Sequence, residues 1–171
     1  MHIIENLYLV GGPGLTVPED AAIYLVRFGE EAALIDAGCG YAHERLIANI
    51  SACLPPETRI PWLFLTHCHF DHVGGADALR KHYGCKIVAH ELDAAFLEAG
   101  DSEVCAALWY GETLAPLPVD IKISQPEHTF PVGCGIIKML HCPGHSPGSV
   151  VYVAEIAEKK VPGREISKYY L

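Results

Sequence analysis

Residues 66–75 read Thr-His-Cys-His-Phe-Asp-His-Val-Gly-Gly, and no other segment constrains the chain as strongly. Three histidines and an aspartate lie within six positions, between an apolar run at 62–65 that predicts a buried strand and a segment at 76–83 that predicts a helix. Imidazole nitrogen is a ligand for zinc and iron, and carboxylate adds a harder oxygen ligand. A loop at the end of a core strand is where folds commonly present their chemistry. The sequence therefore predicts a metal-binding loop at the end of this strand.

The side chains of this loop have different expected roles. His67 and His69 are two residues apart, so in an extended backbone they point the same way and can bind one ion. Asp71 and His72 follow as the chain turns, and they could serve that ion or a second one. Cys68 points away from the two histidines, and we expect it to pack in the interior. A polar surface loop with a chance cluster of histidines is the less favoured interpretation.

The loop resembles the HxHxDH signature of the metallo-β-lactamase superfamily, in the form typical of glyoxalase II-like members. Residues 141–149, His-Cys-Pro-Gly-His-Ser-Pro-Gly-Ser, are similar to that family's PGH-[ST]-PGS loop, and residues 34–38 are similar to its early aspartate-glycine turn. The resemblance implies an α/β fold, a sandwich of two mixed β-sheets with helices outside and the metal site along one edge. It implies one domain over residues 1–171, with the family's closing strands and helices absent.

The resemblance also implies a ligand set. In the family the first metal is held by the histidines that correspond to His67, His69 and His145, and the second by those that correspond to Asp71 and His72 together with residues beyond the strand at 150–156. Residues 157–171 contain no aspartate and no histidine. The resemblance therefore implies one metal per chain, Zn²⁺ before Fe or Mn. Three imidazoles and a water complete a tetrahedral catalytic zinc site, which lowers the pKa of the water to about 7.

The activity implied by this resemblance is metal-dependent hydrolysis. A metal-bound hydroxide attacks a thioester, ester or lactam-type carbonyl of a small molecule, and Asp71 orients or deprotonates the water. Three alternatives stay open. The first is a mononuclear iron enzyme similar to persulfide dioxygenases, which would be an oxidoreductase. The second is a catalytically silent member, and the third is a truncated product of an ordinary two-metal hydrolase.

Composition limits the partners and the compartment. The net charge is −9, and the 12 Lys and Arg residues form no basic run, so neither nucleic acid nor an anionic membrane surface is an expected partner. No apolar run approaches the roughly 20 residues that span a bilayer, and the first residues do not resemble a signal peptide. Seven cysteines without a CxxC pair indicate reduced thiols. We expect a cytoplasmic protein that acts on a small molecule.

The remaining pattern predicts the elements and the assembly. We expect strands at 3–10, 21–28, 32–36, 62–65, 86–89, 121–124, 135–140 and 150–156, and helices at 41–53, 76–83 and 91–99. The strands at 21–28 and 32–36 are expected to form a hairpin, Glu158 and Lys159 a turn, and 100–119 the least regular stretch. A sandwich without its closing elements leaves apolar sheet surface exposed, so we expect a homodimer with contacts from Val150 onward.

Overall fold

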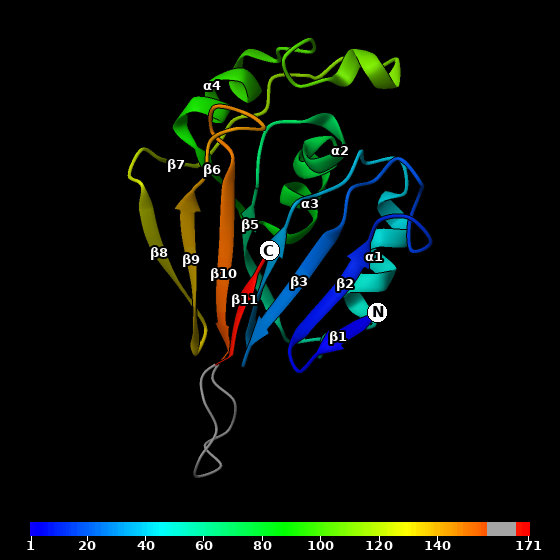
Figure 1. The fold of residues 1–171 in the computed structure, drawn as a ribbon. Helices are drawn as coiled ribbons and strands as arrows, with labels where there is room; N and C mark the ends of the chain where they lie inside the picture. Colours follow the sequence, from blue (N-terminus) through cyan, green and yellow to red (C-terminus); the bar gives the residue numbers. More distant parts are fainter. Residues whose placement is uncertain (157–166) are drawn as a thin grey trace.

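The computed structural model describes residues 1–156 and 167–171, which form two β-sheets packed face to face (Figure 1). The seven-stranded sheet has the order β1-β2-β3-β4-β5-β6-β7, and the four-stranded sheet has the order β11-β10-β9-β8. The strands of the first sheet are β1 (His2–Ile4), β2 (Leu7–Gly11), β3 (Ile23–Phe28), β4 (Glu31–Ile35), β5 (Arg59–Phe64), β6 (Lys86–His90) and β7 (Ile121–Ile123). Those of the second are β8 (Glu127–Val132), β9 (Gly135–His141), β10 (Val150–Ile156) and β11 (Ser167–Tyr170).

The seven-stranded sheet changes direction at its middle. Strands β1 to β4 pair antiparallel, whereas β4, β5, β6 and β7 pair parallel. Parallel neighbours need a crossover connection, usually a helix. The helices are α1 (His43–Ser51), α2 (Phe70–Val73), α3 (Ala76–Tyr83), α4 (Glu91–Ala99) and the 3₁₀ turn η1 (Ala107–Tyr110). The carboxyl ends of β4, β5 and β6 consequently meet at one edge, which brings the segments after Ile35, Phe64 and His90 together.

The seven-stranded sheet is apolar on both faces. In β4, Leu34 packs in the core between this sheet and the helices, while Ile35 packs in the core between the two sheets. Successive side chains of a strand point to opposite faces, so a strand buried on both faces is apolar throughout. Phe64 lies at the centre of the inter-sheet core, with ring centroids 4.9 Å from Phe130 and 5.1 Å from Tyr152.

The two sheets differ in their outer faces. Helices α1, α3 and α4 contact strands of the seven-stranded sheet, and Figure 1 shows them on that side of the molecule. No helix among the described residues covers the outer face of the four-stranded sheet (Figure 1). Strand β11 extends this sheet by pairing with β10 from Val153 to Ile156. Within residues 1–156 and 167–171, no helix is long and apolar enough to cross a membrane.

The predicted α/β class and helices are confirmed, and β3 and β4 form the expected hairpin. The single strand expected at 3–10 is wrong, because Asn6 adopts a φ of 65° and turns the chain between β1 and β2. Strand β8 was not predicted. Its residues Glu127, His128 and Thr129 are exposed and polar, so they carry little apolar alternation. The turn expected at Glu158 and Lys159 lies outside the described residues.

Candidate metal centre

The histidine-rich loop follows β5 directly, as expected. His69 has an extended backbone (φ −69°, ψ 147°) and precedes α2, which carries Asp71 and His72. Phe70 and Val73 on the same short helix are buried and fix it against the protein. Burial of these two apolar side chains leaves Asp71 and His72 partly exposed beside them.

Three imidazoles converge at this edge of the sheets. One ring nitrogen from each of His67, His69 and His145 lies within 4.8 Å of the others, and the ring centroids are 4.5 to 4.7 Å apart. His145 comes from the loop between β9 and β10, so the two sheets each contribute to the cluster. Nε2 of His67 is buried and has no hydrogen-bond partner among the described residues. Buried polar atoms rarely stay unpaired, and a metal ion would supply the missing partner.

The imidazoles of His67 and His69 are held in the form that binds metal. Burial, followed by the neighbouring His72, His69 and His145, lowers the pKa of His67 to about 3. Burial and the proximity of His145 also lower the pKa of His69. A neutral imidazole has the lone pair that a metal requires, and a protonated one does not. The residues present therefore fit a divalent metal.

Asp36 fixes the orientation of this loop. The carboxylate lies at the end of β4, is 3 % exposed, and accepts hydrogen bonds from the backbone N–H and hydroxyl of Thr66, each at 2.8 Å. Because the single hydroxyl proton of Thr66 goes to Asp36, the contact of 3.0 Å between Thr66 Oγ1 and His67 Nδ1 requires His67 to donate. The tautomer of His67 is thereby set, and its Nε2 lone pair is free to face the cluster.

Asp36 also holds His72 by a hydrogen bond, so Asp36 positions a neighbouring side chain and does not itself bind metal. His72 Nδ1 lies 2.7 Å from Asp36 Oδ2, which leaves Nε2 on the side of Asp71, 3.5 Å from Asp71 Oδ2. Burial lowers the pKa of His72, but the hydrogen bond and charge of Asp36 outweigh it and raise the pKa. Asp71 and His72 thus lie beside the three imidazoles without being part of the convergent set.

A second buried carboxylate, Asp93, was not predicted. It lies in the first turn of α4 and accepts hydrogen bonds from Cys68 of the first loop and from Ser146 and Gly148 of the second. The sequence around it reads as an ordinary helix start, and the spacing of the partners, 25, 53 and 55 residues away, gives no local signal. Only the three-dimensional arrangement reveals it.

The remaining histidines near the centre pack against each other. His141, at the end of β9, stacks on His90 with ring centroids 3.8 Å apart and planes at 12°. Nε2 of His141 lies 2.9 Å from the carbonyl oxygen of Pro147, a contact that supports the His145 loop. His90 is buried.

Two buried cysteines near the centre, Cys39 and Cys68, are poor nucleophiles. Burial and then the charges of Asp20 and Asp71 raise the pKa of Cys39 to about 12. The pKa of Cys68 is raised by a hydrogen bond with Cys105, by burial and by the charge of Asp93. Since the thiolate is the reactive form, neither side chain supports covalent catalysis. Cys68 is fully buried in the core, as expected.

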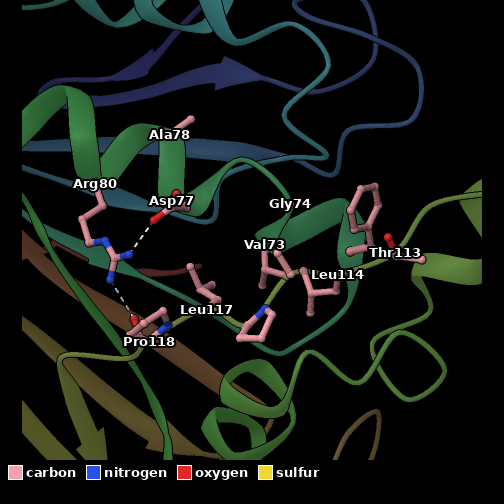
Figure 2. Close-up of a pocket in the computed structure, with 12 residues that line it drawn as sticks. Val73, Gly74, Asp77, Ala78, Arg80, Thr113, Leu114, Leu117 and Pro118 are labelled. Atoms are coloured by element: carbon pink, nitrogen blue, oxygen red, sulfur yellow. Dashed lines mark hydrogen bonds and ion pairs between the residues drawn. The ribbon is translucent and has the colours of Figure 1, made fainter.

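A cavity of about 380 Å³ lies behind α2, away from the three imidazoles. Phe70 and Val73 line it from α2, and Arg80 closes one end through Asp77 and the carbonyl oxygen of Pro118 (Figure 2). None of the three convergent histidines lines this cavity. The centre itself is an open site at the edge of the sheets, because His145 is exposed.

Comparison with known proteins agrees with this geometry. Residues 16–158 match the family model described as the Metallo-beta-lactamase superfamily. The chain is 34 % identical over 132 residues to the hydroxyacylglutathione hydrolase GloC of Haemophilus influenzae, covering 77 % of this chain and 58 % of that protein. It is 31 % identical over 147 residues to the probable metallo-hydrolase YqgX of Bacillus subtilis, covering 85 % and 66 %. The chain thus spans roughly half to two thirds of the length of these relatives.

Solved structures show the same fold. The metallo-β-lactamase GOB-18 of Elizabethkingia meningoseptica superposes with a TM-score of 0.76 at 26 % identity, covering 99 % of this chain and 58 % of that one. The subclass B3 enzyme BJP-1 of Bradyrhizobium japonicum gives a TM-score of 0.79 at 22 % identity, covering 99 % and 60 %. Since the family match extends over most of the sequence, and the two sheets superpose on these structures, the chain belongs to the metallo-β-lactamase superfamily.

Proposed function

We propose that this protein is a metal-dependent hydrolase of small molecules with an electrophilic carbonyl, and that thioesters are its main substrate class. The observation that carries the proposal is the convergence of His67, His69 and His145 around the unpaired Nε2 of His67. Relatives named as hydroxyacylglutathione hydrolases, among them GloC of Haemophilus influenzae, support a thioester over an ester or a lactam.

In this proposal the three imidazoles hold one divalent metal per chain, with Zn²⁺ preferred over Fe or Mn. A metal held there supplies Lewis-acid chemistry, polarising a carbonyl oxygen and lowering the pKa of a water. Asp71 acts as the catalytic residue that orients the attacking water and accepts its proton, since its side chain is one-quarter exposed beside the imidazoles. His72, which is hydrogen-bonded to Asp36, contacts the Asp71 carboxylate and keeps it in position.

The proposed stoichiometry is one metal rather than two. A second ion would need Asp71 and His72 together with further ligands, whereas among the described residues only the three histidines bring their ligand atoms within 4.8 Å of one another. The resemblance places those further ligands beyond β10. Two groups alone leave a metal weakly bound, because catalytic zinc sites ordinarily have three protein ligands.

The test combines metal analysis with an activity panel. The full chain is reconstituted with Zn²⁺ and assayed with an S-acylglutathione thioester, an aryl ester and a β-lactam. We expect thioester hydrolysis that is abolished by a chelator and by His67→Ala and retained in His128→Ala, which removes an exposed histidine of β8. Oxygen consumption by an iron-loaded protein without hydrolysis would instead support the oxidoreductase alternative. Metal binding without turnover of any substrate would support a catalytically silent member.

We further propose that the partner is a small molecule, because the net charge of −9 disfavours polyanions.

We also propose that the chain forms a homodimer through the four-stranded sheet. Strand β11 already covers the edge of β10, so the contact would use the outer face, where Ile136 is 42 % exposed. Light scattering at micromolar concentration should give a dimer mass, and a well-behaved monomer would contradict this assembly.

A further inference from the structure

We infer that Asp93 is the positioning residue that fixes the His145 loop against the His67 and His69 loop, and so sets how the three imidazoles converge. The inference rests on the proposed metal site. Asp93 belongs to neither loop and is 1 % exposed in the first turn of α4. Its two carboxylate oxygens accept hydrogen bonds from both loops. One loop follows β5 of the seven-stranded sheet, and the other lies between β9 and β10 of the four-stranded sheet.

The contacts fall directly beside the proposed ligands. Oδ2 of Asp93 accepts the backbone N–H of Cys68 at 2.9 Å and the hydroxyl of Ser146 at 2.5 Å, while Oδ1 accepts the backbone N–H of Gly148 at 2.7 Å. Cys68 stands between His67 and His69, and Ser146 follows His145. Each of these two contacts is therefore one residue away from a proposed ligand, and a shift of the contact displaces that ligand directly.

The hydrogen bonds around Asp93 have one consistent set of donors. All three partners donate to the carboxylate, as an ionised aspartate requires. The hydroxyl proton of Ser146 is used on Asp93, so in the 2.8 Å contact between the two hydroxyls Ser149 donates to Ser146. Ser149 Oγ in turn accepts the N–H of Ser146 at 2.9 Å. The carboxylate thus orders the turn that carries His145.

The packing of the second loop is concentrated on Asp93. Residues 142–145 and Pro147 are exposed, whereas Ser146 and Gly148 are buried, and these two are the residues that contact Asp93. A Cβ atom on Gly148 would lie 2.6 Å from the backbone nitrogen of Asp93. The loop therefore approaches α4 as closely as its backbone permits. The Asp93 contacts therefore hold the two buried residues of the exposed part of this loop, in addition to the bond from Val150 N–H to the Thr66 carbonyl oxygen at its end.

The role assigned to Asp93 is preorganisation of the metal site rather than contact with substrate. Partners that orient metal ligands commonly change metal affinity by about 10- to 100-fold when they are removed. Asp93→Asn keeps the volume of the side chain. Its NH₂ group is a donor, however, and cannot accept a hydrogen bond from the N–H or O–H group that it faces. We expect Zn²⁺ affinity to fall by about 10- to 100-fold, with the fold retained.

The test measures metal binding and metal geometry in the full chain. Zn²⁺ affinity is determined by competition with a chromophoric chelator, and Co²⁺ is substituted so that its visible spectrum reports the ligand geometry. The matched control is Asp120→Asn, because Asp120 Oδ2 accepts the N–H of Ile87 at 2.8 Å near the opposite end of β6. Ser146→Ala serves as the second variant, since it keeps the carboxylate and removes one of its donors.

The expected result is weaker Zn²⁺ binding and an altered Co²⁺ spectrum in Asp93→Asn, a smaller change in Ser146→Ala, and wild-type behaviour in Asp120→Asn. If Asp93→Asn does not fold, a loss of Zn²⁺ affinity in the folded Ser146→Ala variant still supports the inference, and unchanged affinity there overturns it. Wild-type affinity and spectrum in Asp93→Asn overturn it while leaving the hydrolase proposal intact. Weakened binding in Asp93→Asn, together with a zinc-loaded wild-type protein that hydrolyses none of the substrates, supports the inference and contradicts the hydrolase proposal.

Discussion

The two loops that carry the convergent histidines are built differently. The loop after β5 is part of the core, with Cys68, Phe70 and Val73 buried beneath its polar side chains. The loop between β9 and β10 lies on the surface, and its histidine is exposed. The first loop therefore keeps its shape through hydrophobic packing together with hydrogen bonds to Asp36 and Asp93, whereas the second has little packing and depends on hydrogen bonds to Asp93 and His141.

The two loops should therefore respond differently to the loss of a single contact. Core packing is resistant to loss of a single polar contact, because many atoms share the stabilisation. A surface loop held by a few buried hydrogen bonds loses its position when one buried partner is removed. We therefore expect substitutions in the second loop to change metal binding even when they leave the metal ligands themselves intact.

The largest effect is expected for the ligand set itself. His67→Ala removes the buried imidazole that faces the other two, so we expect metal affinity to fall by more than the roughly 100-fold typical of an outer partner. Elemental analysis after gel filtration checks this, with His128→Ala as the control. Metal retained at one per chain in His67→Ala would show that the centre lies elsewhere.

The next effect distinguishes two glycines of the second loop. Gly148→Ala places a methyl group against the backbone of Asp93, and we expect a loss of about 1–3 kcal/mol in the free energy of unfolding, as for other overpacked sites. Gly144→Ala is the matched control, because nothing lies within 4 Å of its added Cβ. Chemical denaturation of both variants measures the difference. Equal stability of the two would contradict the anchoring of this loop on α4.

A smaller effect is expected for His72, which lies beside the three imidazoles. His72 is held by Asp36 beside the three imidazoles, so His72→Ala should leave about one metal per chain and reduce affinity less than about tenfold, or about 1.4 kcal/mol. Isothermal titration with Zn²⁺ gives both numbers. Two tightly bound ions per wild-type monomer would show that the second site is complete.

The smallest effect concerns charges on the helix that follows the first loop. Hydrogen bonds from Lys81 and Arg80 lower the pKa of Asp77, which is 41 % exposed. A carboxylate with a lowered pKa in the folded state stabilises above its unfolded pKa of about 3.9 and loses that contribution as the pH falls through the folded pKa. Asp77→Asn should cost at most about 0.5 kcal/mol at pH 7 after solvent screening, and less at an acidic pH below the unfolded pKa, where protonation removes the contribution. Thermal melts at the two pH values test this, and a constant difference would contradict the electrostatic origin.

The sequence could predict those parts of the molecule whose signals are local. The histidine loop, helices α3 and α4 and the β3–β4 hairpin each follow from a short pattern of apolar residues, glycines and turns. Strand β8 could not be predicted, because its first three residues, Glu127, His128 and Thr129, are all polar and interrupt the alternation of apolar and polar residues.

The centre shows the same division between local and distant signals. His67, His69 and His145 were predicted from their motifs and converge as expected. Asp93 could not be found in this way, because its partners are far away in the sequence and a helix-start aspartate is commonplace. Its position depends on how α4 packs against both loops.

X-ray absorption spectroscopy of the zinc-loaded protein tests the central claim most directly, namely that three imidazoles from two differently built loops form one metal centre. We predict one zinc per chain with three imidazole nitrogens at about 2.0–2.1 Å. In His145→Ala one imidazole should disappear from the spectrum, while the two from the first loop remain. A zinc with sulfur ligands, or a spectrum unchanged by His145→Ala, would contradict it.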